Sequence, residues 1–254
     1  MNKKIISFLK KEYLLLILIF FSLYLGLSNV FKNETVWWDE ADYLNFARAF
    51  SQGNFENNAP TDYYNHPFSI SNIRAMLYPL ILGIFSMFSD NFSFLRVINL
   101  FFSFFAILFT YFAFKKMFNE KIAFFASMLL ASNWVFQFYS IRFLTEAPAL
   151  MFQMLSIYFF FNNKKKSKIY SGIFLGLATI TRFSSIIIAP AYFILNLLLK
   201  HKKEDYYWIP AIIIGFLPSL IIDLILGNVL FSSIINFLSF NVFFINSSNI
   251  GLLW

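Results

Sequence analysis

The sequence has no cysteine and few charged residues, and each lack excludes a class of protein. Because none of the 254 residues is cysteine, disulfide bonds and thiolate metal sites are excluded. Charged residues make up 13% of the chain, whereas soluble domains carry about 25%. A soluble domain of this length needs a polar surface, and this chain has too few charged residues to form one. Only two histidines are present, His66 and His201, which disfavours a histidine-rich metal site.

Apolar residues take the place of the missing charges. Hydrophobic residues make up 59% of the chain and aromatic residues 22%. Apolar runs of roughly 20 residues recur, and a helix of that length crosses the hydrocarbon core of a bilayer. We therefore predict an all-α membrane protein, with 1–254 as a single transmembrane module. The runs lie at 12–31, 75–89, 93–114, 119–139, 147–161, 168–182, 184–199, 207–226 and, interrupted by Ser and Asn, 229–246.

Four lysine clusters separate these runs and predict the topology. Basic residues favour the cytoplasmic side, so the net charge of +7 reflects topology and not a nucleic-acid partner. All four clusters face the cytoplasm if 75–89, which contains Pro79 and Gly83, lies in the membrane interface. We expect about seven spans, a cytoplasmic N-terminus and a first extracytoplasmic loop over 32–92 with interfacial helices. The clusters are Lys3, Lys4, Lys10 and Lys11; Lys115, Lys116 and Lys121; Lys164, Lys165, Lys166 and Lys168; and Lys200, Lys202 and Lys203.

The outer loop carries an acidic motif just after the first apolar run. Asp39, Glu40 and Asp42 fall within 37–43, beside two tryptophans. Tryptophan is ordinary at a membrane interface, so one interpretation is an aromatic belt with a solvated acidic turn. The other is a carboxylate at the membrane surface that takes the proton of an acceptor hydroxyl within hydrogen-bond reach.

Charged residues also flank later apolar runs on the outer side. Arg142 and Glu146 are four residues apart and would share a helix face. They form either a local ion pair or a site where Arg142 meets a phosphate and Glu146 positions a donor or a cation. Arg182 ends a helix whose Gly172 and Gly176 favour close packing. Its guanidinium either snorkels to the interface or clamps a phosphate.

Arginine dominates the outer basic residues, while the inner clusters are lysine. This split suits phosphate recognition, because the planar guanidinium binds phosphate through two parallel hydrogen bonds. It also fits arginines kept for ion pairs. For Asp223, near the outer end of a span, a site role and a structural hydrogen bond stay open. The outer basic residues are Lys32, Arg48, Arg74, Arg96, Arg142 and Arg182.

Taken in order, these segments resemble the GT-C fold glycosyltransferases, the group that includes protein O-mannosyltransferases and lipid A aminoarabinose transferases. The resemblance implies a GT-C-like bundle of about seven transmembrane helices with juxtamembrane helices in the first outer loop. Family members are usually longer, so we expect this chain to be shortened at its C-terminus. The matching segments are 39–43 with 47–53, 74–79, Arg96 in an Arg-x-x-Asn setting, Thr145 with Glu146, and 172–182.

The resemblance also implies a reaction. The donor would be a polyprenyl-phosphate sugar, and the acceptor a hydroxyl of a protein, lipid or glycan. Asp39 would be the catalytic general base, with Glu40 beside it, and attack would invert the anomeric carbon. Arginine groups, or a divalent cation held by Glu40 and Glu146, would stabilise the leaving lipid phosphate. The residues expected to bind donor or acceptor are Arg74, Arg142, Glu146, Arg182, Asp42 and Tyr43.

Two other functions compete with this one. A transporter or flippase of lipid-linked substrates would place acidic residues and helix breaks at mid-membrane, whereas here the acids cluster at the outer surface. A non-catalytic subunit of a glycosylation complex would suit the short chain. Flux in liposomes without an acceptor would identify the transporter, and activity of the purified chain alone would exclude the subunit.

The predicted topology fixes the side from which position 39 is reached. Labelling at position 39 is expected from the extracytoplasmic side of the intact membrane, because the first helix leaves the cytoplasm just before it. Labelling of position 39 from the cytosolic side alone would contradict this topology.

Overall fold

The elements of the fold are helices, which confirms the all-α class. The computed structural model describes residues 13–30, 36, 38–53, 75–162, 164–198, 203–225, 231 and 234–235. Arg74 and most of 229–246 lie outside these ranges. The α-helices are α2 (Tyr13–Val30), α3 (Trp38–Gln52), α4 (Leu77–Ser86), α5 (Phe92–Met117), α6 (Glu120–Ser132), α7 (Trp134–Ser140), α8 (Glu146–Phe160), α9 (Lys165–Thr181), α10 (Ile188–Leu198) and α11 (Trp208–Ile225), with short 3-10 helices η2 (Phe183–Ile187) and η3 (Lys203–Tyr206).

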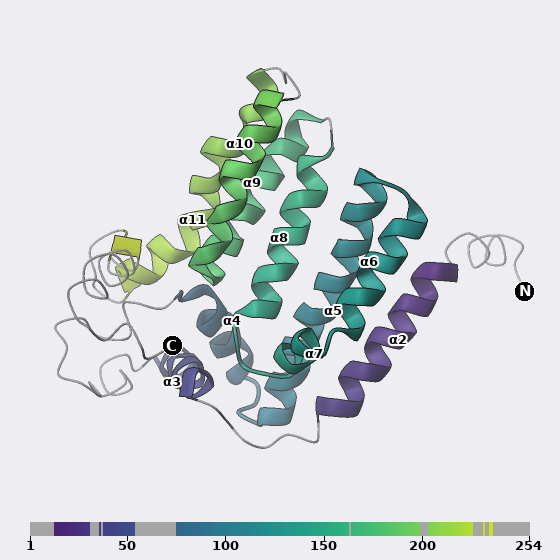
Figure 1. The fold of residues 1–254 in the computed structure, drawn as a ribbon. Helices are drawn as coiled ribbons and strands as arrows, with labels where there is room; N and C mark the ends of the chain where they lie inside the picture. Colours follow the sequence, from purple (N-terminus) through teal and green to yellow (C-terminus); the bar gives the residue numbers. More distant parts are fainter. Residues whose placement is uncertain are drawn as a thin grey trace, which may run out of the picture.

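The helices form a bundle with two different ends (Figure 1). Helices α3, α4 and α7 gather at the lower end in this view, whereas α5 meets α6, and α8 meets α9, at the upper end. Lys115 and Lys116 lie in the last turn of α5, and α9 begins with Lys165. The acidic first turn of α3 contains Asp39 and Glu40. The lysine-bearing ends of α5 and α9 thus lie at the opposite end of the bundle from the acidic turn of α3, and the topology stays a prediction.

Two of the described helical segments are long and apolar enough to cross a membrane by themselves. They are Phe92–Met117 and Glu204–Leu224, and α6 with α7 counts as a third if the bent pair is one span. Shorter apolar helical segments lie at Tyr13–Ser28, Leu77–Ser86 and Phe183–Leu198. These lengths and compositions support a helical membrane protein, while the count of seven spans stays a prediction.

The apolar run 119–139, expected as one span, is broken into α6 and α7. The two helices meet at an angle of 67° across Asn133. The Asn133 side chain accepts a hydrogen bond of 3.0 Å from the backbone N–H of Phe136 and so caps α7. Asparagine is a preferred N-cap because it satisfies an otherwise unpaired helix N–H. The break turns α7 across the lower end of the bundle (Figure 1).

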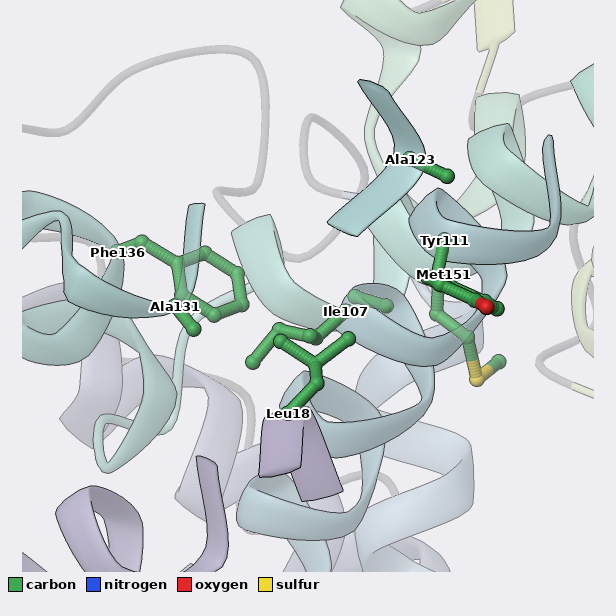
Figure 2. Close-up of a cluster of buried hydrophobic side chains, with 8 residues drawn as sticks. Leu18, Ile107, Tyr111, Ala123, Ala131, Phe136 and Met151 are labelled. Atoms are coloured by element: carbon green, nitrogen blue, oxygen red, sulfur yellow. The ribbon is translucent and has the colours of Figure 1, made fainter. Parts of the chain in front are cut away.

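Two apolar clusters join the helices from α2 to α8. The first lies where α2, α5, α6, α7 and α8 meet (Figure 2), and its buried members are Leu18, Ala106, Ile107, Tyr111, Ala123, Ala131, Phe136 and Met151. The second joins α3, α4, α5 and the loop 141–145, and its buried members are Tyr43, Leu44, Ala47, Tyr78, Leu82, Leu95, Phe143 and Leu144. The second cluster therefore seats α3 on the loop that precedes α8.

Helices α9 and α11 approach closely at their glycines. A Cβ atom added at Gly176 would lie 2.5 Å from the carbonyl oxygen of Ile212 and 2.7 Å from the Cα atom of Gly215. These are backbone atoms, so a side chain at position 176 would push the helices apart. The close packing predicted for the Gly172 and Gly176 pair is confirmed.

Replacing Gly176 with alanine is expected to lower the thermal midpoint of the detergent-solubilised protein. Overpacking costs about 1–3 kcal/mol, which exceeds the roughly 1 kcal/mol that alanine gains over glycine in helix propensity. The matched control is Gly26→Ala in α2, where the new methyl group meets only the side chain of Leu100, which can rotate away. A midpoint for Gly176→Ala at or above that of the control would contradict the close approach.

Candidate functional site

The three acidic residues at the start of α3 differ in how far they are exposed to solvent. Asp39 is exposed, Glu40 is fully buried and Asp42 is half-buried. Tyr43 is buried three residues after Glu40, on the same face of the helix. Acidic residues in a first turn also complement the positive end of the helix dipole. Asp39 is thus the most exposed of the three acids in the motif.

Glu40 binds the loop 141–145 through both of its carboxylate oxygens. Its Oε2 atom lies 3.0 Å from the Nη1 atom of Arg142, and both side chains are buried. Its Oε1 atom accepts a hydrogen bond of 2.9 Å from the backbone N–H of Phe143. Arg142 also lies over the ring of Phe138, 5.0 Å from its centroid. The predicted catalytic role of Glu40 stays a prediction, and its carboxylate has no exposed surface.

Asn99 of α5 binds the backbone around the same loop. Its Nδ2 atom lies 3.0 Å from the carbonyl oxygen of Tyr139, 3.1 Å from that of Ser140 and 2.5 Å from that of Arg142. Residues 141–145 are all buried although they form no helix. Buried backbone groups need hydrogen-bond partners, and Asn99 supplies one to the carbonyl oxygen of Arg142 in the loop. In the sequence, Asn99 stands out only as the asparagine of the Arg-x-x-Asn segment that begins at Arg96. That segment does not indicate that Asn99 bonds this loop.

Tyr78 of α4 links the acids to Asn99. Its hydroxyl donates to the Oδ1 atom of Asn99 at 3.1 Å, and its ring meets the ring of Tyr43 edge-on at 5.8 Å. Burial raises the pKa of Tyr78 well above its ordinary value, and the charges of Glu40 and Glu146 raise it further. The hydroxyl therefore stays protonated and remains a donor.

Glu146 and Arg182 form a second, more accessible ion pair. The Nη1 atom of Arg182 binds the Oε1 atom of Glu146 and lies 3.4 Å from the hydroxyl of Thr145. The Arg182 side chain is 44% exposed and that of Glu146 is 26% exposed. The other carboxylate oxygen of Glu146 is buried, with no hydrogen-bond donor among the described residues. The pair offers an exposed guanidinium at the C-terminal end of α9.

The local ion pair, one of the two interpretations of Arg142 and Glu146, does not form. Helix α7 ends at Ser140 and α8 begins at Glu146, so the two side chains do not share a helix face. Each pairs with a distant residue instead, Arg142 with Glu40 and Glu146 with Arg182. These two ion pairs also engage the carboxylates of Glu40 and Glu146, which were predicted to hold any divalent cation. In the described part of the chain, no group of three acidic or histidine side chains is placed to hold a metal ion.

The other predicted arginines have separate positions. Arg96 is buried on α5, with its guanidinium 5.7 Å from the ring centroid of Phe143. Arg48 is half-buried on α3, 5.8 Å from the ring centroid of Phe92. Arg74, a predicted donor-binding residue, lies outside the described residues. Asp223 is fully buried on α11, and its two interpretations remain open.

Comparison with known proteins gives one match. A family model described as dolichyl-phosphate-mannose-protein mannosyltransferase matches residues 74–225. Searches of curated proteins and of solved structures gave no significant match. The matched region runs from just before α4 to the end of α11. It includes the loop 141–145, Glu146 and Arg182, and it begins after the acidic motif.

Replacing Asn99 with leucine is expected to destabilise the protein more than the same change at Asn196. Asn99→Leu removes the donor to the carbonyl oxygens of Tyr139, Ser140 and Arg142, and a buried polar group left without a partner costs about 1–3 kcal/mol. Asn196 is equally buried but donates to one carbonyl, that of Asp205. Thermal midpoints in detergent measure the difference. Equal losses in the two variants would show that Asn99 does not hold the loop.

Proposed function

Because the chain belongs to the dolichyl-phosphate-mannose-protein mannosyltransferase family, we propose that it moves a sugar from a polyprenyl-phosphate donor to a hydroxyl acceptor on the extracytoplasmic side of a membrane. The family consists of GT-C glycosyltransferases, so the chain is a membrane glycosyltransferase. In our proposal the acceptor hydroxyl belongs to a protein, lipid or glycan, and the anomeric carbon is inverted. Family membership favours this function over transport of lipid-linked substrates.

The proposed topology places the site at the outer surface. The spans are α2, α5, α6 with α7, α8, α9, η2 with α10, and α11, while α3 and α4 lie in the interface. The N-terminus is then cytoplasmic, together with the lysine-rich connections. Support comes from the separation of the lysine-bearing helix ends from the acidic turn of α3 (Figure 1). The donor phosphate lies at the outer leaflet, level with the end of α9.

Asp39 is the proposed general base. Its carboxylate takes the proton of the acceptor hydroxyl while the hydroxyl oxygen attacks the anomeric carbon from the face opposite the phosphate. The bond between that carbon and the phosphate oxygen breaks, and the leaving phosphate keeps the electron pair. A base must reach the proton it removes, and Asp39 is the acid of the motif with an exposed side chain. Asp42 is half-buried on the next turn, and we place it and Tyr43 on the acceptor side.

Arg182 is the proposed partner of the leaving phosphate. Negative charge develops on the phosphate as the bond breaks, so a nearby guanidinium stabilises the transition state. The observation that carries the proposal is the presence of an exposed carboxylate on α3 and an exposed guanidinium after α9 at the same end of the bundle. Glu146 orients Arg182 through its Oε1 atom, and its contact with the donor sugar stays a prediction. Arg74 is a further candidate for the phosphate.

Replacing Asp39 with asparagine is expected to lower sugar transfer about 100- to 10,000-fold, the usual contribution of a general base. The assay uses the purified full chain and a panel of polyprenyl-phosphate sugars, with membrane insertion checked in parallel. Asp90→Asn is the matched control, because Asp90 is an exposed acid in the turn between α4 and α5. Retained transfer in Asp39→Asn, or an equal loss in the control, would refute the assignment of the base.

A further inference from the structure

The buried ion pair between α3 and the loop 141–145 lies between the two reactive parts of the proposed site. Glu40 directly follows Asp39 in the chain, and the loop that it binds directly precedes Glu146. The pair joins segments that are 102 residues apart in sequence. It therefore sets how far the exposed acid of α3 stands from the start of α8.

We infer that Glu40 and Arg142 are positioning residues, whose buried pair fixes the first turn of α3 against the loop 141–145 and so places Asp39 relative to Glu146 and Arg182. This inference rests on the proposed function. Neither side chain needs to touch a substrate, because both are enclosed by the protein. In place of their predicted contacts with donor and acceptor, we assign to Glu40 and Arg142 an effect on the position of Asp39.

The bonds of Glu40 restrain α3 in two directions. One carboxylate oxygen binds a side chain, that of Arg142, and the other binds a backbone N–H, that of Phe143. A carboxylate held at both oxygens cannot rotate about its terminal bond without breaking one of the two interactions. Since Glu40 is in the first turn of α3, this restraint acts one residue away from Asp39. The N-terminal turn is thereby prevented from fraying.

The loop itself is fixed from the opposite side. Asn99 binds the carbonyl oxygens of Ser140 and Arg142, and Tyr78 holds the Asn99 amide in the orientation that this requires. The guanidinium of Arg96 lies over the ring of Phe143. The loop therefore cannot follow α3 if α3 shifts. The loop is bonded to α5, and the bonds of Glu40 to the loop fix the position of α3 relative to it.

The pair lies where small displacements matter most. A reacting group displaced by about 1 Å can cost roughly 100-fold in rate. Glu146, at the start of α8, and Arg182, at the end of α9, pair with each other, whereas the bonds of Glu40 go to Arg142 and Phe143 of the loop. Loss of the pair should therefore move the base and leave the phosphate contact in place. A role in folding alone would give no such separation between the catalytic rate and donor binding.

The test removes both charges together, in Glu40→Gln/Arg142→Met. Removing one partner would leave a buried charge unpaired, whereas removing both is often tolerated in the fold. We expect a folded protein whose kcat falls about 100-fold, with a donor KM within about threefold of the starting protein. A folded double variant that keeps kcat within about twofold would overturn the inference.

The matched control is an ion pair at the opposite end of the bundle, between buried Lys168 and half-buried Asp205. Lys168 lies 3.4 Å from Asp205, and both partners are largely enclosed. Lys168→Met/Asp205→Asn is expected to change the thermal midpoint by a similar amount and to leave kcat unchanged. An equal fall in kcat in this control would show that any buried pair has the same effect, and the inference would fail.

Hydrogen exchange tests the inference independently of the sugar-transfer assay. In Glu40→Gln/Arg142→Met we expect faster exchange of the amides in 38–44, while α5 and α11 keep their protection. Unchanged protection of 38–44 would overturn the positioning role. If the double variant fails to fold, Glu40→Asp keeps the charge but shortens the side chain by one methylene, and the same loss of kcat and protection is expected. Retained transfer in Asp39→Asn would instead refute the proposed function and leave the exchange result standing.

Discussion

The buried pair of Glu40 and Arg142 is the interaction on which the rest of the site depends. A chain with few charges places two of them where solvent does not reach, at a cost in desolvation that their attraction and hydrogen bonds must offset. Hydrogen bonds can offset this desolvation cost because the loop 141–145 is buried and its backbone groups need partners. Glu40 and Asn99 supply those partners from two different helices. The result is a rigid link between the acidic turn of α3 and the start of α8.

The opposite end of the bundle is tied by the same kind of contact. Lys168 of α9 donates to the carbonyl oxygen of Phe160 at 2.6 Å and pairs with Asp205 of η3. Between the two ends the contacts are apolar, apart from hydroxyl groups such as that of Ser156, which bonds the carbonyl oxygen of Ser171 at 2.8 Å. Apolar side chains gain little by leaving lipid for a helix interface. Ion pairs, buried hydrogen bonds and close glycine packing therefore carry much of the specificity.

The sequence predicts the helices well and the pairing of charges poorly. Run length placed α5 within a few residues, since 93–114 corresponds to Phe92–Met117, and the glycines of α9 were correctly assigned to packing. The break at Asn133 was hidden inside an apolar run, although an asparagine N-cap is a readable signal. Spacing suggested that Arg142 pairs with Glu146, because that rule assumes a helix through 141–145. The actual partners come from other helices, and only tertiary packing determines them.

The central claim is that one exposed carboxylate, Asp39, acts as a base in a direct displacement at the anomeric carbon. The anomeric configuration of the purified product, measured by nuclear magnetic resonance against that of the polyprenyl-phosphate donor, tests this most directly. The account predicts inversion, because the acceptor attacks the face opposite the leaving phosphate. Retention would contradict it, because a single displacement from the face opposite the leaving phosphate inverts the anomeric carbon.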